Sequence, residues 1–255
     1  MTTARFSSYV ALGDSFTEGM DDPRGDGTYR GFADLVAGRL AEENGVFRYA
    51  NLAVRGKLLG PVVGEQLPAA VDMAPELVSF AAGGNDALRR RFDPDAIGAG
   101  YSDAIGRLRA TGATVVVFTP ADGTGHLPGR NYLLPRCEAI RQIVHEAAEE
   151  HGALVVDLWA DDGLRDRRMW SIDRLHLSVA GHHRVAAHVL EVLGVEPDPL
   201  WRAALPTVLP PAWYDARHDD LQWAWAHLAP WIGRRLRGRS SGDNITPKRP
   251  VLDTF

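Results

Sequence analysis

Residues 9–19 read Tyr-Val-Ala-Leu-Gly-Asp-Ser-Phe-Thr-Glu-Gly, and this stretch decides the predicted fold. The apolar residues 9–12 predict a buried strand, which Gly13 ends. Ser15 then lies on a sharp turn, and the segment that follows it supplies backbone N–H donors. In parallel α/β sheets, ligands bind where the strands have their carboxyl ends. The stretch therefore predicts a functional serine at the edge of a parallel sheet.

The alternation of short apolar runs with helical sequence continues as far as residue 193. Strands are expected at residues 9–12, 47–52, 77–80, 114–118 and 154–157, and helices at residues 32–40, 94–110, 134–151 and 178–193. Strands that alternate with helices are joined by right-handed crossovers and form a parallel sheet covered on both faces. The sequence therefore predicts an α/β fold around a five-stranded parallel sheet.

The composition excludes several classes of protein. The 255 residues are 45% hydrophobic and 24% charged, which is typical of a globular protein and not of a disordered, collagen-like or coiled-coil chain. The net charge of −5 gives no general attraction to nucleic acid, and no window approaches 18 uninterrupted apolar residues, so we expect neither a nucleic-acid partner nor a membrane span. The single cysteine, Cys137, forms no intrachain disulfide, and without a visible targeting segment we expect a cytoplasmic protein.

The C-terminal region differs from the rest of the chain. The linker Glu196-Pro-Asp-Pro199 divides a domain over residues 1–195 from an extension over residues 196–255, which holds five of the seven tryptophans. A helix is expected from about Ala212 to Arg237, followed by a loose tail over residues 239–255. A helix rich in Trp and Arg fits packing across the sheet domain, a homodimer contact, or a membrane surface. Alternating charges weaken the membrane role, so packing within the chain or between two copies is favoured.

Three further groups of polar residues lie where predicted strands end or where the last helix begins. They are residues 51–56 after the second strand, residues 83–86 after the third, and residues 173–176 before the last helix. Because the functional edge of a parallel sheet is the edge where its strands have their carboxyl ends, we expect these groups beside Ser15. Serine hydrolysis needs a base for the hydroxyl, a group that orients the base, and donors for the tetrahedral oxyanion.

The polar groups contain residues for each of these tasks. His176 can be the base and Asp173 the orienting group, because a spacing of three lets both lie on one turn, with the carboxylate at the imidazole Nδ1–H and Nε2 facing the serine. Donors can come from the Ser15 and Gly56 amides and from the Asn85 side chain, and glycine at position 56 permits close backbone approach. The competing interpretations are structural: Ser15 as a helix N-cap, and Asn85 as part of an Asx turn.

With these blocks in this order, the sequence resembles the SGNH, or GDSL, hydrolase family over roughly residues 7–193. The matching blocks are Gly13-Asp14-Ser15-Phe16, Asn51-Leu-Ala-Val-Arg-Gly56, Gly83-Gly84-Asn85-Asp86 and Asp173-Arg174-Leu175-His176. The resemblance implies a flavodoxin-like three-layer α/β/α sandwich. It also implies that Ser15 is the nucleophile, that Asp173 and His176 finish the triad, and that Gly56 and Asn85 complete the oxyanion hole, with Gly60 as the substitute for Gly56.

Members of this family hydrolyse esters and thioesters of lipids, acetylated sugars, aryl alcohols and acyl carriers, and some transfer the acyl group to an alcohol. The resemblance thus implies a serine esterase that acts on a small-molecule ester with a short- to medium-chain acyl group, such as an acetylated sugar or small metabolite. It requires no metal or organic cofactor. One alternative is an acyltransferase that uses the same site with a sugar or alcohol acceptor. The other is a non-catalytic interaction protein that acts through the C-terminal Trp/Arg helix.

Other reactive residues near the expected site each have two interpretations. His182 and His183 are adjacent and point in different directions, which favours packing or solvent-facing histidines over a metal site. A group of arginines surrounds the expected mouth: Arg55, Arg89, Arg90, Arg91, Arg165, Arg167, Arg168 and Arg174. They suit an anionic substrate, but interleaved aspartates favour ordinary solvated side chains. Met169 and Trp170 are expected to form an apolar wall for the substrate.

Overall fold

The computed structural model describes residues 6–203, 205–206, 213–230, 233, 237 and 239–255. Its centre is a six-stranded sheet in the order β5-β4-β3-β1-β2-β6. The strands are β1 (Ser8–Gly13), β2 (Arg48–Asn51), β3 (Leu77–Ala81), β4 (Thr114–Phe118), β5 (Leu154–Val156) and β6 (Arg249–Thr254). Strands β1 to β5 are parallel, as predicted, so their carboxyl ends share one edge of the sheet.

Strand β1 is buried on both faces, and its side chains alternate between two hydrophobic cores. Tyr9 and Ala11 belong to one core, and Val10 and Leu12 belong to the other. Successive side chains of a strand point to opposite faces, so a strand covered on both sides reads as a continuous apolar run. This explains why residues 9–12 were recognisable in the sequence.

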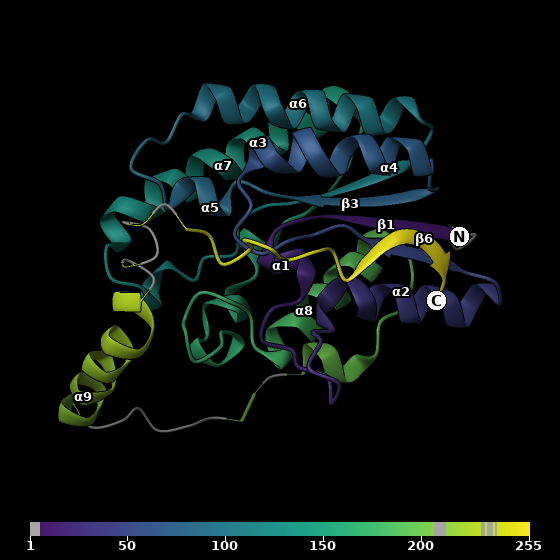
Figure 1. Ribbon diagram of the computed structural model, residues 1–255. Coiled ribbons are helices and arrows are strands. Elements are labelled where there is room, and N and C mark those ends of the chain that lie inside the picture. The colour runs from purple at the N-terminus through teal and green to yellow at the C-terminus, as the bar shows by residue number, and fades with distance from the viewer. Residues whose placement is uncertain (1–5, 204, 207–212, 231–232, 234–236, 238) are drawn as a thin grey trace.

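Two layers of helices enclose the sheet (Figure 1). The first core packs against α2 (Gly31–Asn44) and α8 (Val179–Val192), and the second packs against α6 (Pro94–Ala110) and α7 (Arg130–His151). The helices α6 and α8 have nearly the predicted bounds, whereas α7 begins four residues earlier than expected, before Pro135. The predicted three-layer α/β/α fold is confirmed.

Shorter helical segments follow the strands. Helices α1 (Ser15–Glu18) and α5 (Gly84–Ala87) come directly after β1 and β3. Helix α3 (Leu59–Pro61), a π-helical turn at Val62–Gln66 and α4 (Leu67–Met73) form one segment that the sequence analysis did not predict. Turns of 3₁₀ helix lie at Thr124–His126, Leu158–Ala160, Asp162–Arg165, Arg167–Met169 and Pro199–Arg202. Glycines and prolines make the α3–α4 segment hard to predict from the sequence. Pro61 lies in its first turn, where an N–H group has no helical partner, and Pro68 lies just after the π-helical turn.

The prediction of five strands and of a loose tail over residues 239–255 is wrong, because β6 pairs antiparallel with β2 at the edge of the sheet. Pro250 and its charged neighbours hide this strand in the sequence, although an edge strand tolerates proline. Just before β6, Lys248 Nζ lies 2.8 Å from Asp34 Oδ1 and donates to two carbonyls of the loop before α2. This largely buried ammonium group links the residues before β6 to the domain.

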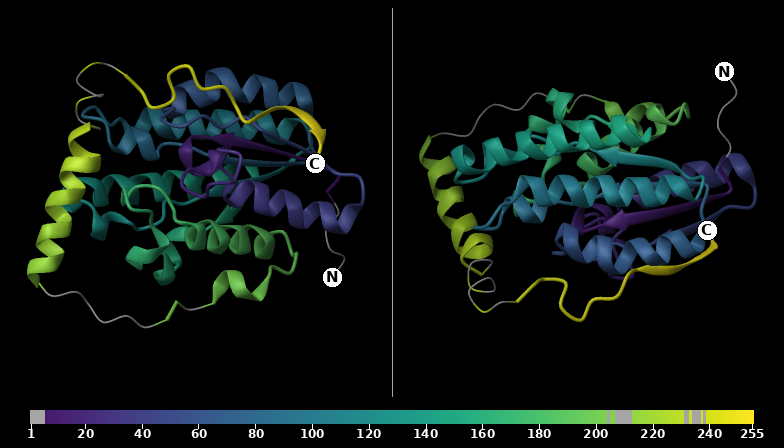
Figure 2. Two further views of the ribbon diagram at one scale, coloured as in Figure 1. Left: turned by 60° about the horizontal axis from the view of Figure 1, so that its bottom comes forward. Right: turned by 90° about the horizontal axis from the view of Figure 1, so that it is seen from above.

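The predicted helix over residues 212–237 is described in part. Helix α9 (Trp213–Trp223) continues as a π-helical turn at Ala224–Leu228, and residues 212, 231–232, 234–236 lie outside the described residues. Figure 2 shows α9 crosswise to the helices of both layers, at the end of the molecule where β1 to β5 have their carboxyl ends. In the part of the chain that is described, no helix is long and apolar enough to cross a membrane. The division of the chain at residue 195 and the cytoplasmic location stay predictions.

Candidate active site

The turn after β1 places Ser15 at the carboxyl edge of the sheet. Gly13 has a φ of 154°, and a Cβ atom there would lie 2.5 Å from the Ala81 carbonyl oxygen, so a larger residue does not fit this turn. Asp14 is the N-cap of α1, because its side chain accepts a hydrogen bond of 3.1 Å from the Phe16 amide. Ser15 is thus the first helical residue, and the capping role considered for it belongs to Asp14.

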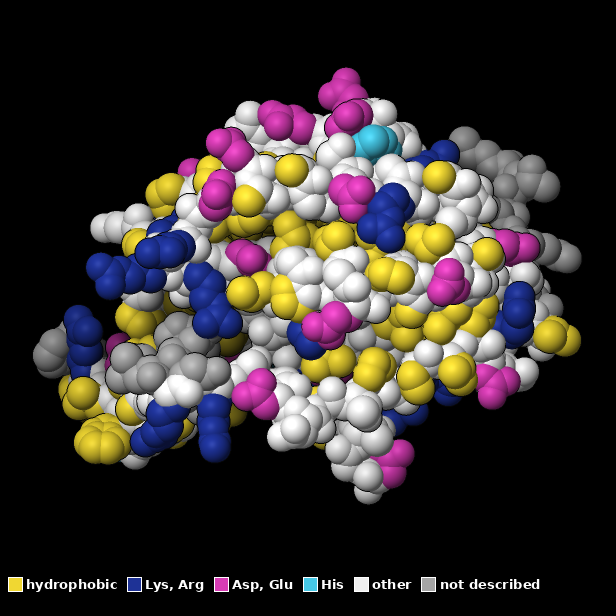
Figure 3. Space-filling view, turned by 45° about the horizontal axis from the view of Figure 1, so that its top comes forward, with side chains coloured by type: hydrophobic (Ala, Val, Ile, Leu, Met, Phe, Trp, Pro, Cys, Tyr) yellow, Lys and Arg dark blue, Asp and Glu magenta, His cyan; other side chains and the backbone are white. Residues whose placement is uncertain are grey.

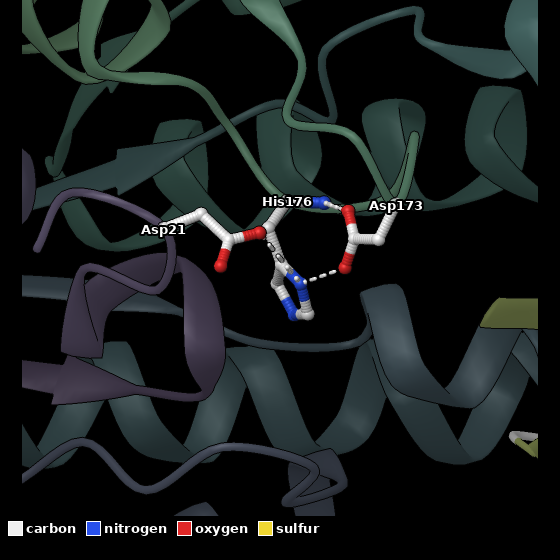
Figure 4. Close-up of side chains that lie close together, drawn as sticks. All are labelled: Asp21, Asp173 and His176. Atoms are coloured by element: carbon white, nitrogen blue, oxygen red, sulfur yellow. Dashed lines mark hydrogen bonds and ion pairs between the residues drawn. The ribbon is translucent and has the colours of Figure 1, made fainter. Parts of the chain in front are cut away.

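The turn before α8 brings Asp173 and His176 together. Asp173 Oδ2 lies 2.6 Å from His176 Nδ1, and Asp173 Oδ1 accepts hydrogen bonds from the amides of Leu175 and His176. Figure 4 shows that Asp21 approaches the same ring from another side, with its Oδ2 3.8 Å from Nδ1. The other ring nitrogen, Nε2, lies on the side of the ring away from the Asp173 carboxylate. It is therefore the nitrogen that is available to a reacting group.

The charges around His176 oppose the effect of its burial. Burial alone would lower the pKa of His176, but the hydrogen bond and charge of Asp173, with the charges of Asp21 and Asp14, raise that pKa above its ordinary value of 6.5. Burial would likewise raise the pKa of Asp173, but its bonds to the ring and amide of His176 and to the Leu175 amide hold that pKa well below its usual range. An ionised Asp173 fixes the proton of a neutral ring on Nδ1, which leaves Nε2 able to accept another.

Asn85 lies on the same edge in α5, but both hydrogens of its side-chain amide are already bonded. Its Nδ2 donates to Asp14 Oδ2 at 2.9 Å and to the Lys57 carbonyl at 3.0 Å. Burial raises the pKa of Asp14 to about 6, against the opposing effects of the Phe16 amide, His176 and Asn85. A role for Asn85 as an oxyanion donor therefore requires one of these hydrogens to be shared or released.

Gly56 lies in the loop after β2 and has a φ of 75°, a left-handed conformation that suits glycine. A Cβ atom at this position would collide with the Ser240 hydroxyl, so the C-terminal segment packs directly on the loop. Gly56 lines a groove together with Ser15. Gly60, the alternative from the sequence, lies in α3 and does not line that groove.

Two cavities meet at Ser15. The inner cavity, of about 210 Å³, has mainly apolar walls that include Phe16, Ala121, Leu133, Cys137, Ile140, Leu158 and Trp170. The outer groove, of about 430 Å³, lies between α7 and the C-terminal region, which contributes Trp223, Ala226, His227, Leu228, Pro230, Arg239, Ser240 and Ser241. Ser15, Asn85 and His176 line both cavities, and Gly56 and Asp173 line the groove. The structure thus brings all five candidate residues to one place. Of the expected apolar wall, Trp170 lines the inner cavity, and Met169 is buried in the core.

His182 packs in the core, and four of the neighbouring arginines form ion pairs. His182 is buried, its Nε2 lies 2.9 Å from the Met20 carbonyl, and burial lowers its pKa to about 4. Figure 3 shows Lys and Arg side chains gathered at the left end of the molecule, near the carboxyl edge of the sheet. Several of the arginines pair with carboxylates: Arg55 with Glu18, Arg165 with Asp162, Arg168 with Asp166, and Arg174 with Asp220. These pairs agree with the interpretation that favours structural arginines over an anionic substrate.

One group of three side chains among the described residues offers atoms that suit a metal ion. The ligand atoms of Asp21, Asp173 and His176 all lie within 4.8 Å of one another. Asp173 and His176 already share a short hydrogen bond through Nδ1, so this nitrogen is a proton donor in the structure. The arrangement suits proton transfer through the ring.

Sequence reasoning missed two contributors to the site. Asp21 lies six residues after Ser15, outside the quoted blocks, and has a left-handed φ of 66° that turns its loop towards His176. The C-terminal residues that line the outer groove were expected to pack, and none of them was named individually as a site residue. The concentration of tryptophans after residue 200 is the signal that could have pointed there.

Comparisons with known proteins agree with this geometry. The profile of the GDSL-like Lipase/Acylhydrolase family matches residues 11–184, whereas a search of the curated proteins gives no match. Among solved structures, the chain is similar to TesA, with 25% identity and a TM-score of 0.59 over 73% of this chain and 97% of that one. It is similar in fold to Axe2, an acetylxylan esterase from Geobacillus stearothermophilus, with 21% identity and a TM-score of 0.60 over 80% and 100% of the two chains. A lipase/acylhydrolase from Enterococcus faecalis gives 22% identity and a TM-score of 0.58 over 75% and 98%. The chain belongs to the GDSL-like Lipase/Acylhydrolase family and is a serine ester hydrolase of this type.

Proposed function

We propose that the protein hydrolyses carboxylic esters of short- to medium-chain acids through an acyl-enzyme on Ser15. The observation that carries this proposal is the Asp173–His176 pair, joined at 2.6 Å where two cavities meet beside Ser15. A serine hydroxyl is a weak nucleophile at neutral pH, so it needs a base whose own orientation is fixed. His176 supplies the base, and Asp173 fixes its orientation.

The reaction takes place in two halves. In the first, Ser15 Oγ attacks the ester carbonyl while His176 Nε2 accepts the hydroxyl proton, and Nε2 then gives this proton to the departing alcohol oxygen. In the second, Nε2 accepts a proton from water as the water attacks the acyl-enzyme, and Nε2 then returns that proton to the Ser15 oxygen as the acid is released. The ionised Asp173 stabilises the imidazolium in both halves, because its pKa is held low by its hydrogen bonds.

The oxyanion that forms in each half is assigned to the Ser15 and Gly56 amides and to Asn85. The left-handed backbone at Gly56 and its place in the groove beside Ser15 support its part in this assignment. Asn85 must share a hydrogen that it now gives to Asp14 or to the Lys57 carbonyl. We therefore rank the two backbone amides above Asn85 as donors.

The two cavities suggest how an ester is bound. The apolar inner cavity suits the acyl chain, and its limited volume of about 210 Å³ favours short or medium lengths. The outer groove, which is open to the C-terminal region, is then left for the alcohol portion. An acetylated sugar or small metabolite belongs to this class of substrate.

The first test is hydrolysis of p-nitrophenyl acetate, butyrate and octanoate by the wild type and by Ser15→Ala. Loss of a triad member lowers the turnover of a serine hydrolase by about 10⁴-fold or more, and we expect a loss of this size. Ser102→Ala is the matched control, because Ser102 lies on α6, away from both cavities. Equal rates for the wild type and Ser15→Ala would contradict an acyl-enzyme on this serine.

A second candidate function is acyl transfer to an alcohol at the same site. The outer groove of about 430 Å³ favours it, because the groove offers space for an acceptor next to Ser15. Product analysis with increasing concentrations of added alcohols tests this candidate. A transfer product that increases with the alcohol would support it, and hydrolysis that no acceptor diverts would contradict it.

A further inference from the structure

The turn that carries Asp173 and His176 contains a strained residue. Arg174 has a φ of 62°, a left-handed conformation that is uncommon for residues other than glycine and costs free energy. Such a conformation persists where surrounding contacts stabilise it. The side chain of Arg174 is only 17% exposed, so its contacts hold it in place.

Helix α9 supplies these contacts through Asp220 and Trp223. Asp220 Oδ1 accepts a hydrogen bond of 2.7 Å from Arg174 Nη1. The Arg174 guanidinium lies 4.8 Å from the centroid of the Trp223 ring, and Trp223 Nε1 donates a hydrogen bond of 2.9 Å to the Asp173 carbonyl. Residues three apart share one face of a helix, so a single face of α9 binds both residues of the turn.

Other large side chains of this region face solvent. Leu221 in α9 is 67% exposed, and Trp225 in the following π-helical turn is 81% exposed. Trp223, in contrast, is half-buried against the turn. Because these large apolar side chains face solvent, they do not attach α9 to the domain. The contacts of Asp220 and Trp223 with the turn do.

We propose that Asp220 and Trp223 are positioning residues, which hold the turn so that Asp173 stays against His176 Nδ1. The inference rests on the proposed function, in which His176 is the base. Neither residue is required to touch the reacting atoms, because both act through Asp173 and Arg174. Trp223 also lines the outer groove, whereas Asp220 does not, so a change at Asp220 reports positioning without altering the groove wall.

The protonation of His176 provides a direct readout. The ionisable groups that act on it are Asp173 from its own turn, Asp21 from the loop after α1, Asp14 at the start of α1, and His182 on α8. Among these groups, Asp173 is the one whose backbone α9 holds. If the turn were released, the hydrogen bond and charge of Asp173 would raise the pKa of His176 less, so that pKa would fall.

The test compares Asp220→Ala and Trp223→Phe with the matched control Trp225→Phe. We expect each test variant to lower kcat for p-nitrophenyl acetate by about tenfold, the order of one lost hydrogen bond, and to move the acid limb of its pH profile to lower pH. For Asp220→Ala, KM stays within about twofold of the wild type, because no groove residue is changed. The melting temperatures of both variants stay close to that of Trp225→Phe, which retains the wild-type kcat and pH profile.

NMR titration of the imidazole of His176 tests the same inference without any substrate, with the signal identified by its absence in His176→Ala. A lower pKa in both test variants, but not in Trp225→Phe, supports positioning even if the wild type hydrolyses none of the esters, in which case the proposed function alone fails. An unchanged pKa of His176 in both variants would overturn the inference. The inference would also be overturned if the melting temperature and the activity both fell while the pKa of His176 stayed unchanged.

Discussion

The inner cavity and the outer groove meet at Ser15, but they are built from different parts of the chain. Every residue that lines the inner cavity lies within residues 11–184, the part matched by the family profile. The outer groove takes one wall from that part and the other from C-terminal residues beyond it, namely Trp223, Ala226, His227, Leu228, Pro230, Arg239, Ser240 and Ser241. The comparison suggests that residues of the family domain determine the acyl preference, and that the C-terminal region determines what alcohol is accepted.

The two walls of the groove are also fastened differently. The domain wall is part of α7, whose apolar face is buried in the core. The C-terminal wall is attached at separate points: Trp223 at the turn of Asp173 and His176, Gly242 close against the Arg55 carbonyl, and Lys248 beside Asp34. Between the first two of these points, the described residues Ala226, Leu228 and Arg239 line the groove, so this part of the C-terminal region belongs to the groove wall.

Among the variants that distinguish the roles of the two cavities, Cys137→Phe is expected to change kcat/KM most. Cys137 lies on α7 and lines the inner cavity, where burial raises the pKa of its thiol to about 11 and keeps it neutral. A phenyl ring at this position fills space that a long acyl chain needs. We expect kcat/KM for p-nitrophenyl octanoate to fall by about 10- to 200-fold relative to acetate, the range for a mismatch of about one methylene group in an apolar pocket.

The control for this variant is Cys137→Ala, which removes the thiol without filling the cavity and should leave the ratio of octanoate to acetate near the wild-type value. Equal losses for acetate and octanoate in Cys137→Phe would mean that the ring obstructs Ser15 itself. An unchanged ratio would place the acyl chain in the outer groove and would reverse the assignment of the two cavities.

A smaller effect is expected from Leu228→Ala in the C-terminal wall of the groove. The truncation removes apolar contact with a bulky alcohol, and a loss of about 1 kcal/mol of burial corresponds to about fivefold in kcat/KM. We expect this loss for 2-naphthyl acetate and little change for methyl acetate. Leu221→Ala is the matched control, since Leu221 lies on α9 and does not line the groove. Equal losses in the two leucine variants would contradict a specific role for this wall.

The sequence predicted the domain well because its signals there are local. The buried run at residues 9–12 and the strand Thr114–Phe118 are short apolar segments bounded by residues that break strands. The spacing of Asp173 and His176 likewise placed both candidate side chains on one turn, where they share a hydrogen bond. Signals of this kind depend on neighbours along the chain, so they can be recognised without knowledge of distant contacts.

The parts that the sequence did not predict depend on contacts between distant residues. Strand β6 pairs with a strand about 200 residues earlier, and the Lys248–Asp34 ion pair and the contact between the Phe255 and Tyr49 rings help to hold this polar segment on the sheet. The contact of Trp223 with the Asp173 carbonyl spans 50 residues. The bonds from Asn85 to Asp14 and Lys57 likewise connect three segments that are far apart in the sequence, and no spacing rule predicts them.

The smallest expected effect concerns Asp21, which is on the domain side of the site and was missed in the sequence. Its Oδ2 lies 3.8 Å from His176 Nδ1, and its negative charge helps to raise the pKa of His176. Asp21→Asn removes this charge, so the pKa of His176 falls. Since Nε2 must be unprotonated to act as the base, activity is lost as pH falls through this pKa, and the acid limb of kcat/KM moves to lower pH.

Two unit charges about 4 Å apart in a water-like medium interact with about 1 kcal/mol. We therefore expect the acid limb of kcat/KM to move by about half to one pH unit. The plateau at higher pH stays unchanged, because Asp173 still orients the ring. Asp26→Asn is the matched control, an exposed aspartate in the same loop. A large loss on the plateau of Asp21→Asn would instead mean that Asp21 shares the orienting role with Asp173. In that case the domain side would hold His176 in part by itself, and the contacts of α9 with the turn of Asp173 and His176 would be correspondingly less important.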